Sequence, residues 1–273
     1  MRAASRHPET GKSVFGEGPP GLEQIRADVD DDGSISATLA DVFGVVNAVS
    51  LYTERPNRTF HAVHVDAAAR LAKRSHDLGV ARLVHVSGIG ADANSSSRYI
   101  RSRGRGEDSV RAAFPIATII RPAVLFGPDD SFLTPLSGLL RSFPVFPVFG
   151  LGQTVLQPAY VEDVAEAITR AFEASYPATV YELAGPMAYS YKSLLETISN
   201  HLNLRRVLLP VPFTVWQILA SCAELLPQPP ITRNQVELMR SDNVPSPGSS
   251  GFRELGIDPR GIEVMLAGSS FST

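Results

Sequence analysis

The chain has 273 residues, of which 44% are hydrophobic and 19% are charged, and its formal net charge is −3. This length and composition allow one large domain, or a core domain with a smaller appendage, around a substantial core. The balanced charge gives no basic surface of the kind that binds nucleic acid, so no nucleic-acid partner is expected. The single cysteine, Cys222, excludes an internal disulfide and a cysteine-based zinc cluster, and the six histidines show no metal-ligand spacing.

The sequence also bears on location. No apolar run reaches the roughly 20 residues that cross a bilayer, and the first residues lack the charged-then-apolar pattern of a secretory signal. A single cysteine fits a reducing compartment. These features favour a cytoplasmic protein without a bound metal.

The first two thirds of the chain alternate short apolar runs with helical patterns. A short stretch from Arg2 to Pro8 is followed by a weaker strand candidate at Leu22 to Val29. Runs rich in β-branched residues predict buried strands at 42–49, 81–86 and 117–121. Apolar spacing predicts helices at 62–79, 97–113 and 161–174. This alternation indicates an α/β fold with a Rossmann-like, doubly wound parallel sheet.

After Tyr176 the pattern changes to a strand at 180–184, a helix at 190–202, an apolar helix at 213–226 and a loop at 243–251. We therefore expect a Rossmann-like core over residues 1–175, a smaller α/β lobe over 176–267 and a tail over 268–273. The helix around Trp216 is apolar on more than one face. Either the lobe itself covers it, or a protein partner or a membrane surface does.

The end of the second strand of a Rossmann fold faces the adenosine ribose of a dinucleotide. An acidic residue there binds the 2′-hydroxyl of NAD, whereas an arginine pairs with the 2′-phosphate of NADP. Ser5 and Arg6 follow the first predicted strand and favour NADP(H) over NAD(H); the alternative is a solvated arginine in a turn.

No Gly-x-x-Gly-x-x-Gly or Gly-x-Gly-x-x-Gly motif precedes this strand. The sheet is therefore expected to lack its first strand and its glycine loop, as an N-terminally truncated or misassigned start would produce. Because that strand is central in the usual order, two half-sheets with unpaired inner edges are expected. Main-chain amides of the loop normally hold the pyrophosphate, so the sequence leaves open whether this form binds a dinucleotide.

A candidate catalytic set follows the strand at 82–86, which delivers Ser87 at its end; Tyr99 and Arg103 are one helical turn apart. In a short-chain dehydrogenase, a tyrosine transfers the proton, a serine orients the carbonyl, and a lysine four residues after the tyrosine lowers its pKa. Arg103 stands where that lysine is expected, so weak or no turnover is predicted. The alternative is that Ser87 only begins a turn and Tyr99 is a half-buried helix residue.

Several separated motifs carry a family resemblance: "NAVSLY", "VHVSGIGAD", "RYIRSRGRGE", "IIRPAVLFGPDDSF", "LQPAYVEDVAEAI" and "YELAGPMAYSYKSLLETI". The chain resembles the atypical short-chain dehydrogenase/reductase family that includes the alpha-subcomplex subunit nine of respiratory complex I and its bacterial relatives. The resemblance implies a Rossmann core with a small C-terminal lobe, NADP(H) binding, and a role in structure or assembly peripheral to a membrane complex. A cofactor-free scaffold and an NADP(H)-sensing regulator are the alternatives.

The same resemblance implies roles for individual residues. It assigns Arg6 to the 2′-phosphate, and Ser87, Tyr99 and Arg103 to the nicotinamide. The remaining expected cofactor contacts are the adenine side, the strand end under the cofactor, and the strand end that meets the carboxamide: Asp28 and Val29; Ala48, Val49 and Ser50; Arg121 and Pro122.

Overall fold

The computed structural model describes residues 1–9, 20–55, 57–128, 130–173, 179–227 and 229–267. Its N-terminal part contains two parallel sheets. One pairs β1 (Arg2–Ser5) with β2 (Glu23–Arg26). The other has the strand order β10-β5-β4-β3, from β10 (Val180–Leu183), β5 (Thr118–Pro122), β4 (Arg82–Val86) and β3 (Gly44–Asn47). The predicted strands of this part of the chain are therefore confirmed, most with shorter bounds and β5 shifted by one residue.

The two sheets do not join into one. Within the described ranges, β1 pairs only with β2, and β3 pairs only with β4. The second edge of each strand has no strand partner there. The expected division into two half-sheets with unpaired inner edges is thus what the described strands form.

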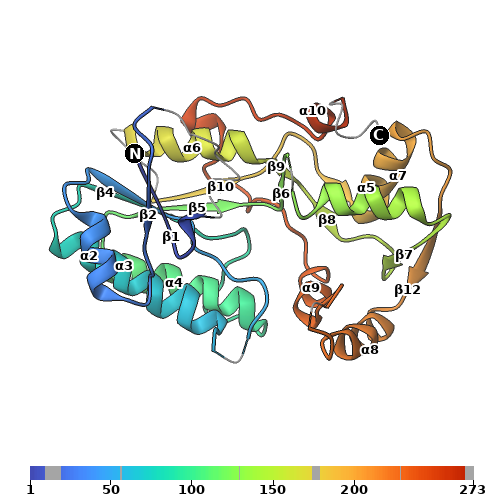
Figure 1. Ribbon diagram of the computed structural model, residues 1–273. Coiled ribbons are helices and arrows are strands. Elements are labelled where there is room, and N and C mark those ends of the chain that lie inside the picture. The colour runs from blue at the N-terminus through green and yellow to red at the C-terminus, as the bar shows by residue number, and fades with distance from the viewer. Residues whose placement is uncertain (10–19, 56, 129, 174–178, 228, 268–273) are drawn as a thin grey trace.

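Helices cover both faces of the four-stranded sheet (Figure 1). On one side lie α2 (Asp32–Leu39), the π-helix η1 (Ala62–Ala67) that continues into α3 (Ala68–Asp77), and α4 (Arg98–Ala113). On the other side lies α6 (Val161–Glu173). The predicted helix at 62–79 is confirmed, but its beginning is wound as a π-helix, a feature that often marks functional sites.

A second lobe, built from short strands and helices, forms the right-hand part of Figure 1. Its strand pairs are β7 (Val145–Phe149) with β12 (Val207–Val211), β6 (Leu125–Phe126) with β9 (Ala159–Tyr160), and β8 (Val155–Leu156) with β11 (Tyr189–Ser190). Its helices are α5 (Leu133–Ser142), α7 (Tyr191–His201), α8 (Phe213–Ala223), α9 (Arg233–Leu238) and α10 (Glu263–Leu266), while the 3-10 turn η2 (Arg253–Leu255) packs beside α6.

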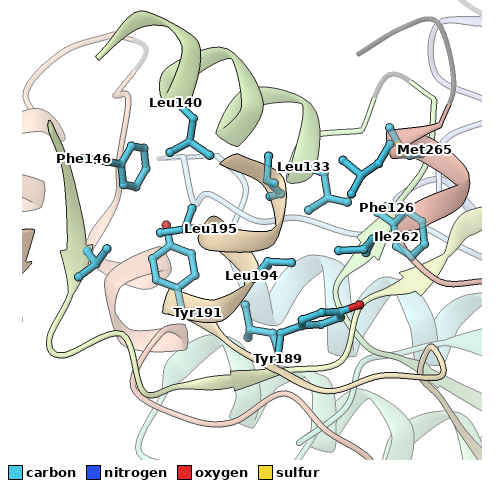
Figure 2. Close-up of a cluster of buried hydrophobic side chains, with 14 of the residues drawn as sticks. Phe126, Leu133, Leu140, Phe146, Tyr189, Tyr191, Leu194, Leu195, Ile262 and Met265 are labelled. Carbon is cyan, nitrogen blue, oxygen red and sulfur yellow. The ribbon is translucent and has the colours of Figure 1, made fainter. Parts of the chain in front are cut away.

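This lobe has its own hydrophobic core, in which Leu133, Leu140, Leu194 and Leu195 are fully buried (Figure 2). Ile198 is fully buried in the same cluster. The cluster draws on residues 126–160 as well as on residues 189–266. The boundary at residue 175 stays a prediction, and the lobe's core takes side chains from both sides of it. Within the described part of the chain, no helix is long and apolar enough to span a membrane. The predicted tail at 268–273 lies outside the described residues.

Asp163 lies in the first turn of α6 and binds a distant segment of the chain. Its carboxylate accepts hydrogen bonds at 2.7 Å from both the backbone N–H and the Nε of Arg260. Asp163 is almost fully buried. It therefore fastens the segment around Arg260 to the start of α6.

Candidate functional site

The Arg103 guanidinium joins three elements at the carboxyl ends of the strands. Its Nη2 donates to the Oγ of Ser50, after β3, at 2.5 Å, and its Nη1 donates to the carbonyl of Val86, at the end of β4, at 3.1 Å. Its Nε and Nη2 also donate to the Tyr99 hydroxyl, at 3.2 and 3.0 Å. Parallel strands end at the same edge of a sheet, which explains why residues so far apart in the sequence meet here. The structure thus brings together three of the predicted site residues.

Ser87 follows directly on β4 and is 3% exposed. Its backbone N–H donates to the carbonyl of Ile120 at 2.7 Å. Its Oγ is buried and has no hydrogen-bond partner among the described residues. A buried hydroxyl without a partner is unfavourable, so this position fits a group that a bound ligand would supply.

Tyr99 is buried in an aromatic cluster. Its ring stacks on Tyr52 with centroids 5.7 Å apart and meets the edge of Phe60 at 5.4 Å. Burial raises the pKa of Tyr99, and the Arg103 guanidinium offsets only part of that shift. Tyr99 therefore holds its proton at neutral pH and is not matched to the operating pH as an efficient general acid–base would be.

A chain of buried hydrogen bonds, which the sequence did not predict, fixes the position of this cluster. The Leu51 N–H donates to His64 Nε2 at 3.0 Å, and His64 Nδ1 lies 2.9 Å from Ser102 Oγ, which donates to the carbonyl of Tyr99 at 2.7 Å. Burial, aided by the Arg103 charge, lowers the pKa of His64 to about 3, so the ring is neutral. Because Nε2 accepts, Nδ1 carries the proton and donates to Ser102.

The π-helix η1 carries His64 close against α4. A Cβ built on Gly106 would lie 2.1 Å from the carbonyl oxygen of His64, so only glycine permits this approach. Nothing in the spacing of the histidines signalled this chain of hydrogen bonds, since His64 and Ser102 are 38 residues apart in sequence.

The loop after β3 is fixed from the opposite side as well. Asn47 donates to His85 Nδ1 across 3.1 Å, and Asn47 Oδ1 accepts from the Val49 N–H at 3.2 Å. Burial lowers the pKa of His85 to about 4, so this packed strand histidine is neutral at pH 7. Ala48, Val49 and Ser50, expected under the cofactor, therefore sit in a loop whose shape is set by the protein itself.

A hollow of about 610 Å³ lies at the ends of β1 and β2 and is lined by Arg6, His7, Arg26, Asp28, Asp31 and Ser34. It contains two predicted residues, Arg6 and Asp28. Arg26 was missed, although the parallel register of β1 with β2 places it opposite Ser5. Ser5 itself is exposed, and the carbonyl of Val29 accepts a hydrogen bond from Arg70 at 2.9 Å.

Arg121 has a different environment from the other site residues. Its Nε and Nη2 donate to the Glu107 carboxylate at 2.9 and 2.7 Å, and its Nη1 donates to Glu182 at 3.1 Å. Glu107 is 1% exposed, and these hydrogen bonds raise the pKa of Arg121. The guanidinium thus faces a buried ion network, while the carbonyl of Pro122 accepts from the Ile89 N–H at 3.1 Å.

Two further findings concern metal ligands and a second hollow. Among the residues that the structure describes, no group of three or more His, Cys, Asp or Glu side chains could hold a metal ion. A second hollow, of about 590 Å³, is lined by Glu182, Ala184 and residues between 245 and 259, and it includes none of the predicted site residues.

The divided parallel sheet and its two helical layers define a Rossmann-type fold. A nucleoside-diphosphate-sugar epimerase from Staphylococcus aureus matches with a TM-score of 0.76 at 15% identity, over 98% of this chain and 90% of that chain. A dTDP-4-dehydrorhamnose reductase from Bacillus anthracis, solved in complex with NADP, matches with a TM-score of 0.64 at 16% identity, over 93% of this chain and 96% of that chain.

By sequence, the chain is related to the alpha subcomplex subunit 9 of NADH dehydrogenase. The mitochondrial subunit of Mus musculus is 32% identical over 246 residues, which are 89% of this chain and 65% of the relative. That of Arabidopsis thaliana is 30% identical over 252 residues, which are 88% of this chain and 62% of the relative. The chain therefore spans less than two thirds of the length of these relatives, and no protein-family model matches it. The relatives confirm the family resemblance of the motifs.

Proposed function

We propose that this chain binds a nicotinamide dinucleotide with Ser87, Tyr99 and Arg103 at the nicotinamide end, and that it has weak or no oxidoreductase turnover. The observation that carries the proposal is the buried Oγ of Ser87, which has no hydrogen-bond partner in the described part of the chain. It follows Val86, whose carbonyl accepts from Arg103 in the polar cluster. The carbonyl of a nicotinamide or of a substrate would supply the hydrogen bond that this hydroxyl lacks.

The proposal includes a preference for NADP(H) over NAD(H). Arg6 and Arg26 line the same hollow as Asp28, at the strand ends where a Rossmann fold takes the adenosine ribose. Two guanidinium groups suit the charge of a 2′-phosphate, whereas the 2′-hydroxyl of NAD needs only an acceptor such as Asp28. The pyrophosphate would lie between this hollow and Ser87.

Weak turnover follows from the state of Tyr99. A short-chain dehydrogenase needs a tyrosine whose proton moves readily, but burial raises the pKa of Tyr99. Arg103 also donates to the Tyr99 hydroxyl through two nitrogens, in place of the compact ammonium of a lysine. The cluster is better suited to holding a nicotinamide than to exchanging protons.

Its relatives are named as subunits of a mitochondrial NADH dehydrogenase. We extend the proposal to a dinucleotide-bound structural or assembly protein, cytoplasmic and peripheral to a membrane complex, with a core over residues 1–175 and a smaller lobe over 176–267. In this role the nucleotide stabilises the folded chain, because a ligand that binds only the folded state raises its stability.

Calorimetric titration with NADPH and NADH tests the cofactor proposal. NADPH is expected to bind more tightly than NADH. Arg6→Ala and Arg26→Ala should each weaken NADPH binding about 10-fold, the usual loss for one charge-assisted contact, and leave NADH binding unchanged. Arg205→Ala, at an exposed arginine outside the hollow, is the matched control. Failure of both nucleotides to bind would refute the proposal and favour the cofactor-free scaffold.

A further inference from the structure

The guanidinium of Arg103 is a buried charge whose hydrogen-bond acceptors are all neutral. Arg103 is 4% exposed. It donates to the Ser50 hydroxyl, the Val86 carbonyl and the Tyr99 hydroxyl, and its Cζ lies 5.3 Å from the centroid of the Tyr99 ring. Hydroxyl, carbonyl and ring carry partial charges only. A buried charge without a counter-ion is unfavourable, and such charges concentrate at functional sites.

The nearest acidic residue along α4 is already bound to other arginines. Glu107 follows Arg103 by one helical turn. Its carboxylate accepts from Arg121 at 2.9 and 2.7 Å and from Arg111 at 3.1 Å. Glu182, the second carboxylate of this ion network, is bound by Arg121 as well. Within the described ranges of the chain, no carboxylate therefore pairs with Arg103.

Three titratable groups beside Arg103 are uncharged at pH 7. Burial raises the pKa of Tyr99. Burial and the Arg103 charge lower the pKa of His64 to about 3 and that of His85 to about 4. The effect on both rings indicates that the field of Arg103 extends across the site. The polar cluster therefore carries a positive charge in surroundings that screen charge less than water does.

This charge distinguishes the two redox forms of the dinucleotide. The nicotinamide ring of NADP⁺ is positively charged, whereas the dihydronicotinamide ring of NADPH is neutral, and the rest of the molecule is the same in both. The inference rests on the proposed function, in which Arg103 lies at the nicotinamide end. We propose that the site selects the reduced cofactor, because the Arg103 guanidinium repels the cationic ring of NADP⁺ and not the neutral ring of NADPH.

The expected selectivity follows from Coulomb's law. Two unit charges about 6 to 12 Å apart, at an effective dielectric constant of about 20, weaken binding by about 100- to 10-fold. NADPH should therefore bind about 10- to 100-fold more tightly than NADP⁺. Occupancy then follows the concentration of NADPH and not that of the total pool. This is the property that a redox-sensing regulator needs.

Calorimetric titration of the full chain with NADPH, NADP⁺ and 2′,5′-ADP tests the proposal. The last of these contains the 2′-phosphate and lacks the nicotinamide, so it reports on the adenosine end alone. The unaltered chain should bind NADPH more tightly than NADP⁺ by the factor given above. Arg103→Gln should bring the two affinities together, because it removes the charge and keeps a polar side chain. Arg103→Lys retains the charge and should keep the preference.

Two control variants separate the Arg103 charge from other effects. Arg105→Gln removes a charge from an exposed position of the same helix and should leave the ratio of the two affinities unchanged. Arg6→Ala should weaken NADPH and NADP⁺ by the same factor, since both carry the 2′-phosphate. Far-UV circular dichroism of each variant confirms that it folds, and the comparison of NADPH with NADP⁺ on the unaltered chain needs no variant.

Equal binding of NADPH and NADP⁺ by the unaltered chain, or a preference that Arg103→Gln leaves intact, would overturn the proposal. If 2′,5′-ADP binds and the two redox forms bind equally, the selectivity alone is wrong and cofactor binding stands. If none of the three ligands binds, the proposed function is refuted and this inference with it.

Discussion

Two buried neutral histidines should make the stability of this protein fall in mild acid. Burial and the nearby Arg103 charge lower the pKa of His64 to about 3 and that of His85 to about 4. In the unfolded chain both return to about 6.5. Between pH 6.5 and about 4 the unfolded chain therefore binds more protons than the folded one, so the free energy of unfolding decreases as the pH falls.

The size of the effect follows from the two pKa values. Each histidine lowers the free energy of unfolding by about 1.4 kcal/mol for every pH unit that the pH falls between its pKa in the unfolded chain and its pKa in the folded chain. From pH 7 to pH 5 the loss is about 2 kcal/mol for each ring, or about 4 kcal/mol for both. This loss is a large part of the free energy of unfolding of a typical domain, which is about 5–15 kcal/mol.

Urea denaturation at half-unit steps from pH 7 to pH 5 measures this slope. His64→Gln and His85→Gln should each lower stability at pH 7 and remove about half of the pH dependence, because glutamine does not titrate. His201→Gln, at an exposed position near the end of α7, is the matched control and should leave the slope unchanged. A free energy of unfolding that is flat between pH 7 and pH 5, or a slope that survives both substitutions, would refute the assignment of two buried neutral rings.

Two further substitutions test the packing around the site. Gly106→Ala should lower the free energy of unfolding by about 1–3 kcal/mol, since its Cβ would lie 2.1 Å from a backbone carbonyl oxygen. Gly138→Ala is the control: its Cβ would have nothing within 4 Å, so it should raise the free energy of unfolding by up to about 1 kcal/mol. Equal effects of the two substitutions in thermal melts would contradict the close approach of η1 to α4. Glu107→Ala should cost about 1–3 kcal/mol because it removes one of the two carboxylates that pair with the half-buried Arg121 guanidinium. Asp108→Ala, at an exposed carboxylate, should change stability by under about 0.5 kcal/mol. A Glu107→Ala urea midpoint close to that of this control would show that the ion network adds little.

The core strands were predictable because a parallel strand buried on both faces reads as a continuous apolar run, as at Val84 and Ile120. The strands β7 and β12 were missed because each contains a proline. Pro147 and Pro210 are both exposed, and each strand belongs to a two-stranded sheet, where a missing N–H is tolerated at the open edge.

Part of the candidate site could also be predicted from the sequence, and part could not. The contact between Tyr99 and Arg103 could be predicted, because one helical turn separates them, and Ser87 at the strand end stays a predicted site residue. The partners of His64 and Arg26 come from distant segments, brought close by the packing of η1 on α4 and by the β1–β2 register. The inward side of Trp216 also depends on tertiary contacts with Val148 and Phe149, which helical periodicity alone does not reveal.

A crystal structure of the chain with NADPH would test both ends of the proposed site at once. We predict the nicotinamide within hydrogen-bonding distance of Ser87 Oγ and beside Tyr99, and the 2′-phosphate between Arg6 and Arg26. A nucleotide bound elsewhere, or a Ser87 hydroxyl that still has no partner when the nucleotide is bound, would contradict the assignment of this cluster to the cofactor.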